Sequence, residues 1–154
     1  LPVEDIQIQA LWEMISENAC FESGWSPGRL PCWVDEHCWV RGHLNSLAQA
    51  LENVLRNAIR HSPADGVVSL GGQREGSEWH LWLDDQGGGV APEELERIFA
   101  PFIRLDGSRP GDGGFGLGLS IARNAMRLQG GSLWAQNTEQ GLRVHIRLPA
   151  RPDA

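Results

Sequence analysis

Four glycines fall within six residues at positions 113–118, and a segment with the helical spacing of apolar residues begins directly after them. A backbone so rich in glycine can adopt positive φ angles and can approach a ligand closely. The helix that follows would direct its first N–H groups and the positive end of its dipole at whatever the loop holds. The stretch therefore predicts a loop that binds an anion, such as a phosphate, at the start of a helix.

Two further motifs precede this loop along the chain. Asn53 and Asn57 lie one turn apart in a predicted helix, and the sequence Asp85-x-Gly87-x-Gly89 follows a predicted strand. A glycine-rich turn alone often has a purely structural role as a helix cap. The three motifs in this order instead favour an ATP-binding site.

Composition excludes several other classes of protein. The 154 residues fit one domain, which we assign to residues 1–150, with a C-terminal tail at 151–154 and fraying expected from Pro149. The net charge of −7 disfavours nonspecific binding to nucleic acid or to an anionic membrane, because both need a basic surface. All 13 basic residues are arginines, which excludes a Walker-type phosphate loop and the strand lysine of protein kinases.

No apolar run of 18 residues and no signal-peptide pattern occurs in the sequence, so we expect a soluble chain. The three cysteines lack C-x-x-C spacing and are interpreted as reduced thiols in preference to a zinc site.

Hydrophobic periodicity predicts an α/β two-layer sandwich, in which a mixed sheet of about five strands lies under about three helices. The predicted helices cover residues 6–21, 44–60 and 117–128, with a short one at 92–99. The predicted strands cover 67–73, 78–84, 132–136 and 142–148, and two short strands, 32–34 and 38–40, pair as a hairpin. In the last strand, Arg143, His145 and Arg147 alternate with apolar residues and are expected on a solvated face.

Asn53 and Asn57 share one helix face, which we expect opposite the leucine stripe of residues 44–60. Arg56 and Arg60 flank this face and make it positive, and an asparagine oxygen can ligate Mg²⁺. A solvated helix surface is the alternative interpretation, and it would be preferred for an asparagine without these neighbours.

Side chains alternate between the two faces of a strand, and Asp85 falls on the same face as the apolar residues of strand 78–84. We therefore expect it to point toward the buried face. A buried carboxylate is costly unless it is hydrogen-bonded, and the exocyclic amine of an adenine would supply a donor beside the small Gly87 and Gly89. The alternative is an aspartate that only forms the turn before the glycines.

Residues 101–114 contain four glycines and two prolines with little periodicity, and predict a lid that is mobile without nucleotide. Phe99 and Phe102 are interpreted as apolar anchors of the lid. Arg104 and Arg109, within it, could bind a triphosphate, although arginines in loops are often only solvated.

With these motifs assigned, the chain resembles the catalytic ATP-binding domain of bacterial sensor histidine kinases, in the GHKL superfamily. Residues 51–62 resemble the N box and Asp85-x-Gly87-x-Gly89 the G1 box. Residues 98–102 resemble the F box, and Gly114-x-Gly116-x-Gly118-Leu119 the G2 box. Four boxes in order are a strong signal, whereas any one of them would be weak.

The resemblance implies Mg-ATP bound under the lid, with Mg²⁺ on Asn57 and adenine on Asp85, and transfer of the γ-phosphoryl group to a histidine elsewhere. Asn53, Asn57, Arg60, Arg104 and Arg109 would be the catalytic residues. The nucleotide contacts would be Asn53, Asn57, Arg60, His61, Asp85, Gly87, Gly89, Gly114, Gly116, Leu117, Gly118 and Leu119.

The resemblance also implies partners: the dimerisation and phospho-acceptor domain of a parent kinase, and a response regulator. It implies a cytoplasmic domain of an inner-membrane sensor, monomeric in isolation. No His-Glu/Asp-x-x-Thr-Pro acceptor motif occurs in the chain, so we interpret it as a catalytic fragment. His43 stands where many relatives have Asp before the N-box helix.

Two other functions remain as alternatives. The first is a GHKL-type ATPase, but such relatives place a glutamate base four residues before the magnesium asparagine, where this chain has Asn53. An amide cannot accept a proton from water, so hydrolysis would lose its base. The second is an interaction module that binds nucleotide without transferring phosphate.

Overall fold

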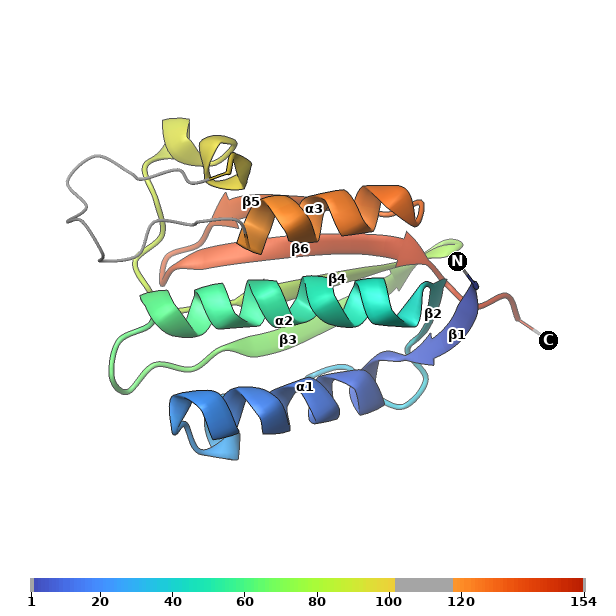
Figure 1. Ribbon diagram of the computed structural model, residues 1–154, viewed down its shortest axis with the longest axis horizontal. Helices are drawn as coiled ribbons and strands as arrows, with labels where there is room; N and C mark the ends of the chain where they lie inside the picture. The colour runs from blue at the N-terminus through green and yellow to red at the C-terminus, as the bar shows by residue number, and fades with distance from the viewer. Residues whose placement is uncertain (1, 102–117, 154) are drawn as a thin grey trace.

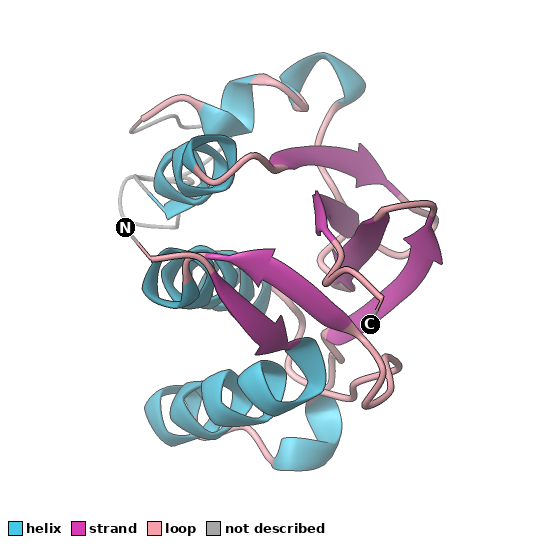
Figure 2. Ribbon diagram, turned by 90° about the vertical axis from the view of Figure 1, so that its right-hand side faces the viewer, coloured by secondary structure: helices cyan, strands magenta, loops and turns pink. Residues whose placement is uncertain are grey.

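Three helices lie side by side on one face of a four-stranded antiparallel sheet (Figure 1). This computed structural model describes residues 2–101 and 118–153. Viewed from the side, the described helices are on one side of the sheet and leave its other face without a helix (Figure 2). The elements are β1 Glu4–Gln7, α1 Ile8–Ser23, η1 Pro27–Arg29, β2 Trp39–Gly42, α2 Leu44–His61, β3 Ser69–Glu75, β4 Glu78–Asp84, η2 Pro92–Glu94, η3 Arg97–Phe99, α3 Gly118–Leu128, β5 Ser132–Asn137 and β6 Leu142–Pro149.

The middle helix, α2, is packed between α1 and α3. Its apolar stripe faces the sheet, where Leu47, Leu51 and Leu55 are almost completely buried. The helix ends where the sequence predicts, because Ser62 has the extended backbone conformation that a following proline favours. Helix α2 therefore contacts both neighbouring helices.

The sheet has the order β3-β4-β6-β5, and its inward side chains form the core under the helices. In the central pair, Leu81 lies opposite Ile146 and Leu83 opposite Val144, and all four are buried. The predicted two-layer α/β fold is confirmed. The strand count and direction differ from the prediction: the four strands are antiparallel, and a parallel bridge from Cys32 to Leu70 extends the β3 edge.

The predicted hairpin of residues 32–34 and 38–40 is wrong. Cys32 bridges to β3, whereas β2 pairs with β1, with Ile6 opposite Val40. Ile6 fits the helical spacing of the segment after it, but it belongs to a short strand whose partner is more than 30 residues away. Local periodicity cannot reveal a pairing between such distant segments.

The end of the chain is held in place, contrary to the expected fraying. Ala150 is buried and bridges to Val40, and the Arg151 N–H donates to the Trp39 carbonyl at 2.9 Å.

The predicted helix at 92–99 consists of two short 3₁₀ turns. None of the described helices combines the length and the apolar character needed to span a lipid bilayer.

The expectation that His145 lies on a solvated face of the sheet is wrong. Arg143 and Arg147 are partly exposed and form ion pairs, but His145 is only 6% exposed. The rings of Trp134 and His145 stack in parallel with centroids 4.8 Å apart. Hydrogen bonds link Glu75 to His80 at 2.9 Å, His80 to His145 at 2.8 Å and His145 to Gln136 at 2.9 Å. Burial, together with the nearby His80, lowers the pKa of His145 to about 4.

This histidine should make the fold sensitive to acid. The folded pKa of His145 lies below its ordinary value of 6.5, so the unfolded chain binds the proton more tightly. Neutral His145 therefore makes its full contribution to the free energy of unfolding above about pH 6.5, and this contribution is lost as the pH falls toward 4. We expect the free energy of unfolding to fall by about 2 kcal/mol more between pH 7 and pH 5 in the wild type than in a His145→Gln variant. Urea unfolding at both pH values measures this difference, and identical pH dependence in the two proteins would contradict it.

Candidate nucleotide-binding site

The C-terminal half of α2 carries the two predicted asparagines. Asn57 is buried, at 8% exposure, beside Val54 and Ala58, so it lies at the border of the apolar stripe and not opposite it as expected. Asn53 is partly exposed and faces the start of α3, where a Cβ added to Gly118 would lie 3.8 Å from the Asn53 Cβ. The structure therefore brings the N-box helix against the end of the G2 box.

The positive charge predicted for the helix face of these asparagines is partly neutralised. Arg56 lies 3.4 Å from the Glu22 carboxylate of α1 and also donates to the Asn53 Oδ1 at 3.5 Å. Arg60 is exposed in the last turn of α2, where a cation interacts favourably with the helix dipole.

Asp85 directly follows β4 and is 5% exposed, as the strand parity predicts. Its Oδ1 accepts the N–H groups of Gly87 and Leu142, each at 3.0 Å. Among the described residues no donor is recorded for Oδ2. The turn-forming interpretation thus has a direct basis in Oδ1, whereas the adenine interpretation needs Oδ2 and stays a prediction.

The glycines around Asp85 are required by close backbone approaches. A Cβ on Gly87 would clash with the His61 carbonyl, and one on Gly141 would clash with the Asp85 backbone. Gly89 has a φ of +74° and packs against the Asn137 amide, which also holds Val90 through bonds of 2.7 and 3.0 Å. The sequence predicts space for a flat ligand beside these glycines. In the structure their main effect is that the G1 box can pack against α2 and β5.

Three residues of this region were missed by sequence reasoning: Asn137, Gly141 and Leu142. They come from the β5–β6 turn, more than 50 residues after Asp85, and support its carboxylate or its loop. Their only sequence signal was a glycine just before an alternating strand, which is common in ordinary hairpins.

His61 links the N box to the G1 box. Its backbone carbonyl packs against Gly87, and burial lowers the pKa of its ring, an effect that the charge of Asp85 partly opposes. The lowered pKa favours the neutral ring, which can both donate and accept a hydrogen bond.

Phe99 of the F box packs against α3. Phe99 is 6% exposed, and the Arg123 guanidinium of α3 lies 4.3 Å from its ring centre. Arg123 also pairs with Glu96 at 3.0 Å. Of the G2 box, Gly118 and the fully buried Leu119 are described. The predictions for Phe102, Arg104, Arg109, Gly114, Gly116 and Leu117, and that of a mobile lid, lie outside the described residues.

These residues could hold a nucleotide with its metal. Asp85 Oδ2 can accept a hydrogen bond from an amine, and the Asn57 amide oxygen is a suitable Mg²⁺ ligand. In the described part of the chain no group of three or more His, Cys, Asp or Glu residues could coordinate a metal. Mg²⁺ at Asn57 would therefore take its other ligands from phosphate oxygens and water.

Comparison with known proteins identifies the family. Residues 42–152 match the family described as histidine kinase-, DNA gyrase B- and HSP90-like ATPase. The chain is 61% identical over 150 residues to the sensor protein PfeS of Pseudomonas aeruginosa, covering 97% of this chain and 33% of that protein. It is 37% identical over 149 residues to the sensor histidine kinase CpxA of Escherichia coli K12, covering 95% and 32%.

Solved structures show the same fold. The mycobacterial sensor histidine kinase MprB superposes with a TM-score of 0.80 at 28% identity, covering 99% of this chain and 100% of that one. Full-length ShkA in complex with AMPPNP gives 0.74 at 23% identity, covering 100% and 32%. The chain spans about a third of the length of the curated relatives it matches. On the match over residues 42–152 and the identity to PfeS and CpxA, this chain belongs to the histidine kinase-, gyrase- and HSP90-like ATPase family, as a histidine kinase-type ATP-binding domain of the sensor kinases.

Proposed function

We propose that this domain binds Mg-ATP and donates the γ-phosphoryl group to a histidine on a separate acceptor domain. The observation that carries the proposal is the buried Asp85, whose Oδ1 is fixed by two backbone N–H groups while Oδ2 has no recorded donor within residues 2–101 and 118–153. A carboxylate held in this way can recognise the exocyclic amine of adenine. It would repel the carbonyl oxygen that guanine carries at the equivalent position.

The remaining motif residues would orient the triphosphate. Asn57 would ligate Mg²⁺, which neutralises phosphate charge when bound. Arg60 and the start of α3 beside Asn53 would attract phosphate oxygens. Arg104 and Arg109 are proposed to complete the phosphate contacts, and Gly87, Gly89, Gly114, Gly116, Leu117 and Leu119 to line the nucleotide together with His61.

The chain would then act mainly by positioning. In phosphoryl transfer a ring nitrogen of the acceptor histidine forms a bond to the γ-phosphorus, the bond from that phosphorus to the β,γ-bridging oxygen breaks, and ADP leaves. The protein holds the γ-phosphate in line with the attacking nitrogen and stabilises the charge. No base for water is needed, which fits an asparagine at position 53.

The family also contains ATPases, so hydrolysis is the second candidate. In this chain the Asn53 oxygen accepts from Arg56, and an amide cannot accept a proton from water.

A nucleotide-binding module without transfer is the third candidate. We favour the kinase because the family relatives PfeS and CpxA are sensor proteins.

We further propose partners and a location. The parent protein would supply a dimerisation domain with the acceptor histidine, and a response regulator would receive the phosphoryl group. The domain would work in the cytoplasm, as part of a membrane-bound sensor, and residues 1–150 would form a single folded unit.

Mixing experiments test the proposed transfer. With radiolabelled ATP, the domain alone should neither label itself nor turn over ATP at more than a trace rate. When the acceptor segment of the parent is added, that segment should gain an acid-labile, base-stable label, as expected for phosphohistidine. Steady ATP turnover by the domain alone would instead favour the ATPase, and binding without transfer at high concentration would favour the interaction module.

The role of Asp85 is tested by Asp85→Asn. Asparagine keeps an oxygen for Gly87 and Leu142 but places an NH₂ group toward the adenine amine, so ATP binding should weaken about 10- to 150-fold. The matched control is Asp84→Asn, because Asp84 pairs with Arg143 on the outer face of the sheet, with bonds of 2.6 and 2.8 Å. Calorimetry should show unchanged ATP affinity for this control and weak GTP binding to the wild type. Equal affinity of the wild type for ATP and GTP would disprove the assignment.

The role of Asn57 is tested through magnesium. Asn57→Ala should abolish the gain in nucleotide affinity that Mg²⁺ gives the wild type, because the only protein ligand proposed for the ion is lost. Asn45→Ala, on the exposed side of the first turn of α2, is the control and should keep the full magnesium effect. Titrations with and without Mg²⁺ measure it. A magnesium effect of the same size in Asn57→Ala and wild type would show that Asn57 is not the ligand.

A further inference from the structure

Helix α1 carries apolar residues on its exposed side as well as on its buried side. Ile8, Leu11, Trp12 and Ile15 face the core. Met14 and Phe21 lie two turns apart on the other side and are 48% and 91% exposed. A large apolar side chain that is nearly fully exposed at a helix end contributes little to the fold of this chain.

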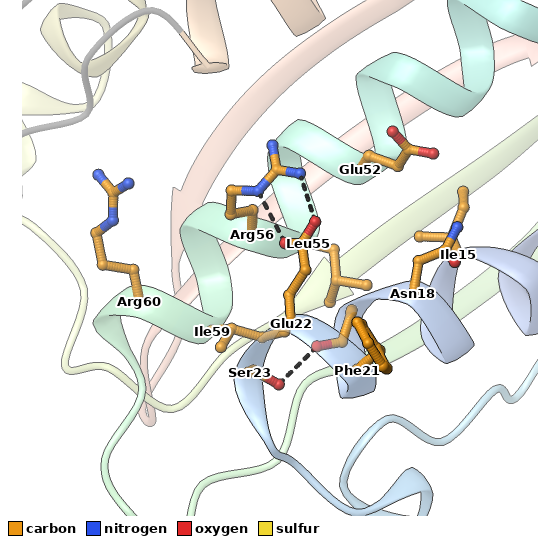
Figure 3. Close-up of a pocket in the computed structure, with 11 residues that line it drawn as sticks. Ile15, Asn18, Phe21, Glu22, Ser23, Glu52, Leu55, Arg56, Ile59 and Arg60 are labelled. Carbon is orange, nitrogen blue, oxygen red and sulfur yellow. Dashed lines mark hydrogen bonds and ion pairs between the residues drawn. The ribbon is translucent and has the colours of Figure 1, made fainter.

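Two grooves run along the sides of this helix. The first, of about 380 Å³, lies between α1 and α2, and Phe21 stands at its edge (Figure 3). Its apolar part is formed by Ile15, Ala19, Leu55 and Ile59. The second, of about 500 Å³, separates α1 from residues 27–32 and has Trp12, Cys20 and Leu30 among its lining residues. Met14 and Phe21 thus form a ridge on α1, with a partly apolar groove on either side of the helix.

The charges around the ridge are mostly acidic, although Arg56 and Arg60 also line the first groove. Helix α1 contains three glutamates and no basic residue, and Glu13 and Glu17 line the second groove. Glu22 and Glu52 line the first, where Glu22 pairs with Arg56 at 3.4 Å (Figure 3). Within residues 2–101 and 118–153, Glu13, Glu17 and Glu52 have no recorded ion pair. This surface therefore offers apolar contacts together with acidic groups that a cation could pair.

We propose that α1 and its two grooves form a docking surface for a basic amphipathic helix of a partner protein. Apolar anchors of that helix would pack around Phe21 and Met14, and its Lys or Arg residues would pair with Glu13, Glu17 and Glu52. The 16 residues of α1 extend over about 24 Å, which matches a partner helix of about four turns. The second groove, whose charged lining residues are Glu13 and Glu17, favours a basic protein helix over an anionic lipid surface. This function is additional to the nucleotide chemistry proposed above.

The test uses a defined probe: a 16-residue helical peptide with leucines on one face and lysines on its flanks. Backbone NMR of the domain should show the largest shifts at residues 13–22 and at the groove residues of α2. The dissociation constant should rise at least tenfold for Phe21→Ser and for the double variant Glu13→Lys/Glu17→Lys. Because these side chains are exposed, the variants should remain folded, which their spectra check.

Two controls are matched to this test. Leu128→Ser removes another exposed apolar residue, on α3, and should leave the dissociation constant unchanged. The same peptide with glutamate in place of every lysine should not bind. The proposal is overturned if the acidic peptide binds equally well, if the shifts lie elsewhere, or if Phe21→Ser binds like the wild type. It is also overturned if sedimentation shows that a second copy of the chain covers this face.

Discussion

The carboxylate of Asp85 is the interaction on which the arrangement of the site depends. Its Oδ1 joins the end of β4 to the G1 loop through Gly87 and to the start of β6 through Leu142. The absence of a side chain at Gly141 and Gly87 lets these segments approach so closely. A buried carboxylate would be costly without these two donors, and with them it becomes a fixed acceptor beside α2.

Helix α2 connects this acceptor to the rest of the molecule. On the side of α3 it presents Asn53 next to Gly118, and on the side of α1 it contributes Leu55 and Ile59 to the groove of Figure 3. Arg56 contacts both sides, because it pairs with Glu22 and donates to Asn53. The nucleotide-binding motifs and the proposed docking surface thus share one rigid helix.

The sequence was informative wherever the signal was local. The stripe of α2, its end at Ser62 and the span of β4 were predicted closely, because each follows from nearby residues. Pairing between distant segments was not predictable: β1 with β2, Cys32 with Leu70, and the burial of His145 under Trp134. For the same reason the motifs could be read from the sequence, whereas the support that Leu142 and Gly141 give Asp85 from the far end of the chain was missed.

A titration of the isotopically labelled domain with Mg-ATP, followed through its backbone amide signals, tests the central claim most directly. If Asp85 and Asn57 hold the nucleotide, the largest changes should occur at residues 53–61, at the Gly87–Gly89 turn, at Gly141 and Leu142, and at the start of α3. Signals of the outer sheet face around His145 should stay unchanged. Changes confined to the groove between α1 and α2, or no change at millimolar Mg-ATP, would contradict the account.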